Sequence, residues 1–139
     1  MTILDAYAGS GAAGFEALSR GSLLVEAIEA NRNVARTIQD NAKTLGADFS
    51  YILYQMTVET WLGSPRQQSD RERYDVIIAD PPYSQLDDEV LSRLVAFLLP
   101  TGRLVVSHGS KRTPPVIESG ELIQTKIYGD SALSFYNKN

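Results

Sequence analysis

The chain has 139 residues, of which 43% are hydrophobic and 22% charged, so it has the size of one domain and the composition of a soluble globular protein. It contains no cysteine and one histidine, which excludes disulfides, thiolate zinc sites and cysteine nucleophiles and argues against a bound metal. The formal net charge of -4 has the wrong sign for holding a phosphate backbone by bulk charge, so action on nucleic acid needs a local basic patch or a partner.

No basic region followed by an apolar stretch opens the chain, and no apolar run approaches the roughly 18 residues that a membrane span needs. We therefore expect a cytoplasmic protein. One core is all that a chain of this length holds, so we expect a single domain over residues 1–139.

Short apolar runs alternate with amphipathic stretches along the chain. The pattern predicts strands at 3–4, 23–28, 51–54, 76–79 and 102–107, with helices at 12–20, 31–45, 58–62 and 87–99 between them. Asn31 is a predicted N-cap, and Gly46 follows the same helix where a left-handed residue is favoured. The continuous apolar run 76–79 is typical of a central strand buried on both faces, and 63–73 is predicted to be a surface loop.

The C-terminal part differs in kind, because two β-prone runs, 121–128 and 132–136, are joined by Gly129-Asp130-Ser131, as in an antiparallel hairpin. Repeated β-α-β units give parallel pairing through right-handed crossovers. The expected fold is therefore α/β: a doubly wound, mostly parallel, Rossmann-like sheet of seven strands with an antiparallel C-terminal hairpin and helices on both faces. Ligands bind such sheets beyond the carboxyl ends of the strands.

A glycine motif follows the first predicted strand, since Gly9 to Gly14 reads G-x-G-x-x-G, and Glu29 lies where such folds place an acid for a ribose. The alternative is a tight turn beside a surface glutamate. Asp5 places a negative charge at the mouth of the turn, which repels a pyrophosphate and favours an ammonium or sulfonium cation. A nicotinamide-dependent oxidoreductase, drawn from the glycines alone, stays a further alternative.

Asp80-Pro81-Pro82-Tyr83 ends the fourth predicted strand. The two prolines have no N–H group and fix φ, so the carbonyls of Asp80 and Pro81 form a rigid cluster of acceptors. With the Asp80 carboxylate they can accept both hydrogens of an exocyclic amine, while Tyr83 offers a ring face to a base. The alternative is a proline turn with a partly buried tyrosine.

The segment 4–21, together with Asp80-Pro81-Pro82-Tyr83 and the ending Tyr128-Gly129-Asp130-Ser131-Ala132-Leu133-Ser134-Phe135-Tyr136, resembles the RsmD family. These bacterial enzymes methylate a guanine N2 of small-subunit (16S) ribosomal RNA. The resemblance covers essentially the whole chain and implies an S-adenosylmethionine-dependent RNA methyltransferase that is a monomer and acts on ribosomal RNA or an assembling small subunit.

The resemblance also implies roles for individual residues. Asp5 would hold the methionine ammonium, and Glu29 the ribose hydroxyls. Asp80, Pro81 and Pro82 would orient the target amine, with Tyr83 stacked on the base. The remaining cofactor contacts implied are the wrapping segment Tyr7, Ala8, Gly9, Ser10 and Gly11, and the adenine neighbours Ala30, Thr57 and Val58.

Three departures from the family are visible. Thr57 offers a hydroxyl where members often carry an acid or an amide, and Ser107 stands where they often carry a glutamate. Members usually have an N-terminal segment with a helix that covers the cofactor and basic residues that meet RNA, whereas Met1 lies almost on the first strand here, so we expect that segment to be missing. The alternatives left open are a DNA adenine-N6 or cytosine-N4 methyltransferase, and a truncated cofactor-binding module without turnover.

Three smaller predictions concern residues outside these motifs. His108, at a strand end, is interpreted as a surface or hinge residue, with a substrate contact as the alternative. The pair Lys111-Arg112 is interpreted as part of a solvated loop. Trp61, Leu62, Phe97 and Leu98 are expected in the core.

Overall fold

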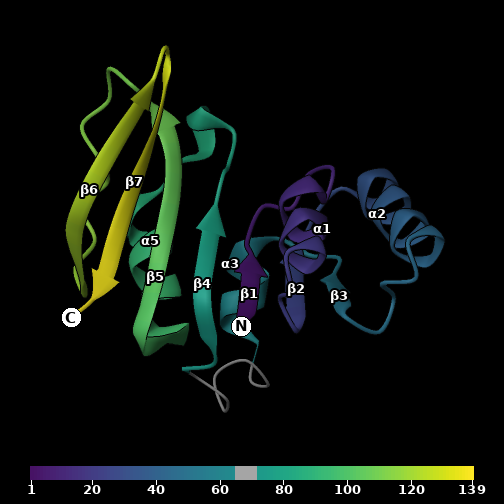
Figure 1. Ribbon diagram of the computed structural model, residues 1–139. Helices are drawn as coiled ribbons and strands as arrows, with labels where there is room; N and C mark the ends of the chain where they lie inside the picture. Colours follow the sequence, from purple (N-terminus) through teal and green to yellow (C-terminus); the bar gives the residue numbers. More distant parts are fainter. Residues whose placement is uncertain (65–71) are drawn as a thin grey trace.

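A seven-stranded sheet runs through the computed structural model, which describes residues 1–64 and 72–139 (Figure 1). The strand order is β3-β2-β1-β4-β5-β7-β6. Five strands are parallel, and β7 runs antiparallel to both β5 and β6. The strands are β1 (Thr2–Asp5), β2 (Leu24–Ile28), β3 (Tyr51–Tyr54), β4 (Tyr74–Ala79), β5 (Leu98–Gly109), β6 (Gly120–Tyr128) and β7 (Ser131–Lys138).

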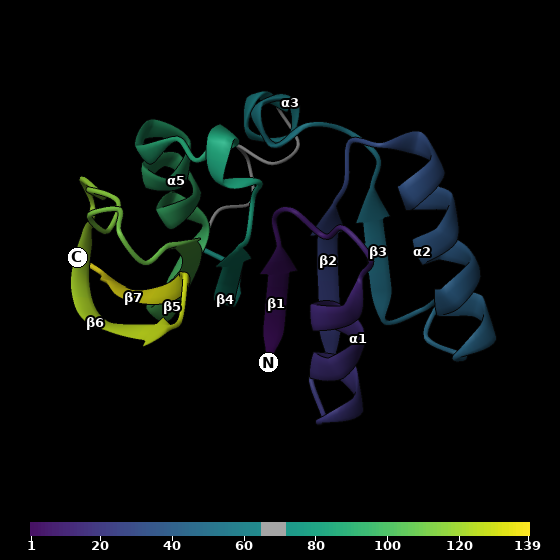
Figure 2. The same cartoon turned by 90° about the horizontal axis from the view of Figure 1, so that it is seen from above.

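Helices lie on both faces of this sheet (Figure 2). The helices α3 (Val58–Gly63) and α5 (Asp88–Leu94) cover one face, with the short 3-10 turns η1 (Tyr83–Gln85) and η2 (Val95–Phe97) beside α5. On the opposite side α1 (Ala12–Ser19) packs on β1 and β2, and α2 (Arg32–Thr44) packs on β3. The predicted fold class is therefore confirmed, including the antiparallel hairpin at the C-terminus.

Each face of the sheet has its own core. The larger cluster lies between the sheet and the helices α3 and α5. As predicted, it contains four fully buried residues: Trp61, Leu62, Phe97 and Leu98. The smaller cluster lies under α1 and α2 and contains Ile3, Ala8, Val25, Ala27, Ile38, Ala42 and Tyr51. Alternate residues of β1 point to the two clusters, which holds the carboxyl end of this strand firmly between the layers.

Local signals account for the helix ends. The side chain of Asn31 accepts hydrogen bonds from the backbone N–H groups of Asn33 and Val34, as expected of an N-cap. Gly46 has a φ of 67°, so the chain leaves α2 through a left-handed residue. Asp87 caps α5 in the same way as Asn31 caps α2.

Two expectations were wrong, one about the helix predicted at 87–99 and one about the burial of β4. The helix predicted to reach residue 99 ends at Leu94, and β5 begins at Leu98, because Leu98 pairs with Tyr74 of β4. The strand β4 is fully buried on one face only, since Val76 and Ile78 are partly exposed. The helices α1 and α2 pack on β1, β2 and β3, and in the described ranges no helix covers β4 on that side.

Most of the loop predicted at 63–73 lies outside the described residues. Within residues 1–64 and 72–139, no helix is both long enough and apolar enough to cross a bilayer. The same residues contain no group of three or more His, Asp or Glu side chains that could hold a metal ion.

Candidate functional site

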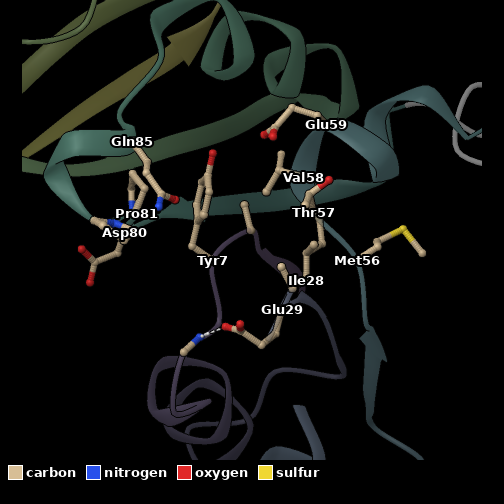
Figure 3. A pocket seen from close by; sticks show the side chains of 14 residues that line it. Tyr7, Ile28, Glu29, Met56, Thr57, Val58, Glu59, Asp80, Pro81 and Gln85 are labelled. Carbon is tan, nitrogen blue, oxygen red and sulfur yellow. Dashed lines mark hydrogen bonds between the residues drawn. The ribbon is translucent and has the colours of Figure 1, made fainter. Parts of the chain in front are cut away.

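A cavity of about 520 Å³ opens at the carboxyl ends of β1, β2 and β4, where the strand order reverses between β1 and β4 (Figure 3). Figure 3 shows Tyr7 in its middle, with Pro81 and Gln85 on one side and Thr57 and Val58 on the other. The lining residues are Ala6, Tyr7, Gly9, Ile28, Glu29, Ala30, Met56, Thr57, Val58, Glu59, Asp80, Pro81, Pro82 and Gln85. Residues from four predicted strand ends therefore meet in one place.

The glycine loop between β1 and α1 forms one wall. Gly9 and Gly11 have φ values of 56° and 82°, a conformation that side chains with a Cβ rarely adopt. The N–H of Ala8 donates to the carbonyl of Ile28 at 2.9 Å, which ties the loop to the end of β2. Of the loop residues predicted to wrap a cofactor, Tyr7 and Gly9 line the cavity, whereas Ala8, Ser10 and Gly11 do not.

Glu29 is held in place by backbone amides. Its Oε1 accepts a hydrogen bond from the N–H of Gly9 at 2.9 Å, drawn in Figure 3, and its Oε2 accepts one from the N–H of Asn31 at 2.8 Å. Each carboxylate oxygen has a further lone pair for a ligand. The glutamate is therefore oriented beside the glycine loop before anything binds.

Asp5 lies beneath this wall with only 2% of its surface exposed, and its Oδ2 has no hydrogen-bond partner. Burial, together with the charges of Asp80 and Glu29, raises the pKa of Asp5 to about 7, although the backbone N–H of Tyr7 acts in the opposite direction. A buried carboxylate oxygen without a partner is unfavourable. A cation brought to this point would stabilise its charged form.

The electrostatics of the cavity follow from these acids. Asp5, Glu29, Asp80 and Glu59 lie in or next to its wall, and within residues 1–64 and 72–139 no arginine or lysine lines it. Such a wall repels a pyrophosphate and attracts a ligand that carries a positive charge. The cavity is thus poorly suited to a dinucleotide, in agreement with the expectation from Asp5.

Thr57 and Val58 begin α3 at the other wall. The hydroxyl of Thr57 accepts from the N–H of Thr60 at 3.1 Å and donates to the Thr60 hydroxyl at 2.9 Å, so it acts as the N-cap of α3. Val58 is 3% exposed and, with Ile28 and Ala30, gives this part of the cavity an apolar surface.

Of the four motif residues that follow β4, Asp80, Pro81 and Pro82 line the cavity, but Tyr83 does not. Pro81 is buried, and the Asp80 carboxylate is exposed and points away from Tyr7 in Figure 3. The hydroxyl of Tyr83 donates to Ser131 Oγ at 2.9 Å, a contact with the C-terminal hairpin.

Sequence reasoning missed five lining residues. Ala6 and Ile28 directly adjoin predicted site residues, so their positions at the ends of two predicted strands could have identified both. Met56 precedes the predicted pair Thr57 and Val58 in the same way. Glu59 likewise adjoins Val58, whereas Gln85 carried no such signal, because it reaches the cavity from the short turn η1, whose orientation depends on packing.

Two further predictions concern the end of β5 and the loop that follows it. The interpretation of His108 as a surface residue was wrong, since it is 1% exposed and its ring nitrogens contact the Gly109 carbonyl and the Ser134 hydroxyl. Arg112 pairs with Asp88 at 2.9 Å, and both side chains are partly exposed. Neither residue lines the cavity.

Comparisons with known proteins agree on one family. The model described as "Conserved hypothetical protein 95" matches residues 1–137. The "Ribosomal RNA small subunit methyltransferase D" of Haemophilus influenzae is 30% identical over 140 residues, which cover 96% of this chain and 69% of that protein.

Solved structures agree with the sequence comparisons. A "conserved hypothetical protein" of Streptococcus pyogenes superposes with a TM-score of 0.83 at 29% identity, covering 99% of this chain and 86% of the other. The structure named "Putative methyltransferase yhhF", from Escherichia coli, gives a TM-score of 0.85 at 25% identity, with 99% and 75% covered. Both similarities extend over the sheet and the cavity together.

Proposed function

This chain belongs to the family of conserved hypothetical protein 95, the RsmD-like methyltransferases, and on that premise we propose that it transfers a methyl group from S-adenosyl-L-methionine to an exocyclic amine of small-subunit ribosomal RNA. Guanine N2 is the amine we propose. The observation that carries the cofactor assignment is the buried Asp5 carboxylate, which has no partner for Oδ2 and lies below a wall of acids. S-Adenosylmethionine carries two positive charges, an ammonium and a sulfonium, which the acidic side chains of this wall would attract.

The residues of the cavity fit this cofactor. Asp5 would hold the ammonium, and Glu29, already oriented by two backbone amides, would accept hydrogen bonds from the ribose hydroxyls. Ala30 and Val58 would lie against the adenine. The backbone from Tyr7 to Gly11, including Ala8 and Ser10, would follow the methionine and ribose, with Thr57 at the adenine edge only through its backbone, because its hydroxyl caps α3.

The bound cofactor supplies an electrophilic methyl group with a neutral thioether as leaving group. The work of the protein is then alignment, which can contribute roughly 7–11 kcal/mol. Asp80 and the carbonyl acceptors of Asp80 and Pro81 would accept hydrogen bonds from the two amine hydrogens and turn the nitrogen lone pair toward the methyl group. The methylated nitrogen would then release one proton to solvent through the exposed Asp80 carboxylate. Pro81 and Pro82 keep this turn rigid and free of competing N–H donors.

We also propose that the partner is ribosomal RNA or an assembling small subunit, that the protein acts as a monomer, and that it works in the cytoplasm. We propose residues 1–139 as the catalytic domain. The net charge of -4 makes the RNA contact dependent on local features of the surface rather than on bulk charge.

The test is methyl transfer from radiolabelled S-adenosylmethionine to three acceptors: 16S ribosomal RNA, assembled small subunits, and duplex DNA. We expect label in ribosomal RNA, recovered after digestion as N2-methylguanosine. Label in adenine N6 or cytosine N4 of DNA instead would overturn the RNA assignment. Binding of S-adenosylhomocysteine without transfer to any acceptor would indicate a cofactor-binding module.

A further inference from the structure

The hydroxyl of Tyr83 is bound to a part of the chain 48 residues away. It donates to Ser131 Oγ at 2.9 Å, where Ser131 is the first residue of β7. Tyr83 is 46% exposed, so a large part of its ring remains accessible beside the cavity. The tyrosine that directly follows the two prolines is thus fixed at its far end by the C-terminal hairpin.

The position of Ser131 is itself fixed by the sheet. Ser131 pairs with Gly109 at the end of β5 and with Tyr128 at the end of β6. The N–H of Ser110 donates to the Asp130 carbonyl at 2.8 Å, which attaches the tip of the hairpin to the end of β5. A Cβ on Gly109 would lie 3.9 Å from Tyr83 Cδ2, so the ring packs against the end of β5.

Buried polar contacts below the tip hold the hairpin against β5. His108 Nε2 lies 2.7 Å from Ser134 Oγ, which in turn lies 2.9 Å from Thr125 Oγ1. The hydroxyl of Tyr136 donates to the Pro115 carbonyl at 2.6 Å. These contacts give a structural role to Ser134 and Tyr136 of the segment 128–136. Among the hydroxyl side chains of that segment, Ser131 is the one bound to the Asp80–Tyr83 motif.

The hydrogen bond limits what Tyr83 can offer a substrate. Its hydroxyl is already engaged as a donor, so the exposed part of the side chain is left for a ligand. Bases stack on the faces of aromatic rings, and holding the ring in advance removes part of the entropy lost when a base binds.

We propose that Ser131 is a positioning residue, which holds the Tyr83 ring as a stacking surface for the base whose amine is methylated. The proposal rests on the proposed function and extends it, because it assigns a role in substrate binding to the hairpin. It also makes the base, rather than the phosphate backbone, the part of the substrate that this region recognises.

The test compares Ser131→Ala, Tyr83→Phe and the double variant with wild type in methyl transfer to 16S ribosomal RNA. We expect each single variant to raise KM for RNA about threefold to tenfold, with kcat and the affinity for S-adenosylhomocysteine unchanged. The double variant should match either single variant, since both remove the same hydrogen bond. Ser131→Thr keeps the hydroxyl and should restore the wild-type KM.

Tyr128→Phe is the matched control, because it removes a tyrosine hydroxyl from the residue paired with Ser131 in the same hairpin. It should leave KM unchanged. Additive effects of Ser131→Ala and Tyr83→Phe, or an effect on kcat with KM unchanged, would overturn the proposal.

A second measurement keeps this proposal separate from the function. Fluorotyrosine labels all seven tyrosines, and the Tyr83 resonance is the one absent from Tyr83→Phe. We expect Ser131→Ala to shift or broaden this resonance and Ser131→Thr to leave it in place. If wild type methylates no RNA, the proposed function fails while this spectrum still reports whether Ser131 holds the ring. A resonance unaffected by Ser131→Ala would overturn the positioning role.

Discussion

The two halves of the sheet hold the proposed functional side chains in different ways. On the β1–β3 side the Glu29 carboxylate is held by backbone, since it accepts from the N–H of Gly9, 20 residues away, and from the N–H of Asn31. On the β4–β7 side the contacts join two side chains, such as Tyr83 with Ser131 and, away from the cavity, His108 with Ser134. The proposed cofactor wall is thus held by side-chain-to-backbone contacts, and the proposed target wall by contacts between side chains.

This difference predicts that the two walls can be damaged separately. A change on the β1–β3 side should act on cofactor affinity or on stability. A change on the β4–β7 side should act on transfer or on RNA binding, with cofactor affinity preserved. Each of the following variants changes one wall, and the measured quantity shows whether the effect stays with that wall.

The largest effect is expected from Asp80→Ala, which removes the carboxylate proposed to orient the target amine. Methyl transfer should fall by about 100-fold or more, as when a group that stabilises the reacting atoms is removed. The affinity for S-adenosylhomocysteine should stay within a few-fold of wild type. The control is Asp40→Ala, an exposed position on α2, which should change neither quantity. A large loss of cofactor affinity in Asp80→Ala would show that the walls are not separate.

Gly14→Ala tests how closely α1 approaches the sheet. A Cβ at this position would lie 2.7 Å from Tyr51 Cε2 and 2.9 Å from Val25 Cγ1, inside the smaller core. Overpacking of this kind lowers the free energy of unfolding by about 1–3 kcal/mol. Unfolding in denaturant measures this loss of free energy. In Gly63→Ala, where a Cβ meets nothing within 4 Å, stability should not fall; an equal loss in both variants would contradict the packing argument.

Glu29→Gln keeps the shape of the side chain but turns one acceptor into an NH₂ group that faces a backbone N–H. We expect the affinity for S-adenosylhomocysteine to fall about tenfold, in line with the strength of hydrogen bonds to a charged group. Calorimetric titration measures the change. Glu16→Gln removes an exposed charge paired with Arg20 on α1 and is the control. Unchanged affinity in Glu29→Gln would remove the glutamate from the ligand site.

The smallest effect concerns pH. Asp5 keeps its proton in the folded chain up to pH about 7 but releases it near 3.8 when unfolded. Between these values the folded state binds more protons, so the free energy of unfolding falls as pH rises. Asp5→Asn has no carboxyl to ionise, so it avoids this loss of stability at high pH. Its ligand-free Tm should exceed that of wild type by about 4 °C at pH 8, with little difference at pH 4. It should also weaken cofactor binding; a Tm difference that does not grow with pH would contradict the account.

The contrast between the walls also explains what could be predicted from the sequence. The positions of Gly9, Glu29 and Asn31 follow from short-range rules for turns, strand ends and caps, and the structure brings them together as those rules predict. The same rules found Asp80, because it directly follows an apolar strand. They also gave the parallel pairing of the first five strands, since right-handed β-α-β crossovers join parallel strands, whereas the strand order came only from the structure.

The rest depended on contacts that no local pattern encodes. Nothing near His108 in the sequence indicates that its ring is buried against Ser134, which is 26 residues away. The exposure of Val76 and Ile78 likewise depends on which strands α1 and α2 cover, not on the apolar run itself. Gln85 lines the cavity only because of how η1 packs.

The central claim is that the acidic cavity holds S-adenosylmethionine, and a calorimetric titration tests it most directly. S-Adenosylhomocysteine, which keeps the ammonium, ribose and adenine, is titrated into the chain, with NADH as the control ligand. We predict micromolar binding of S-adenosylhomocysteine, weakened in Glu29→Gln, and no binding of NADH. Binding of NADH without binding of S-adenosylhomocysteine would contradict the account.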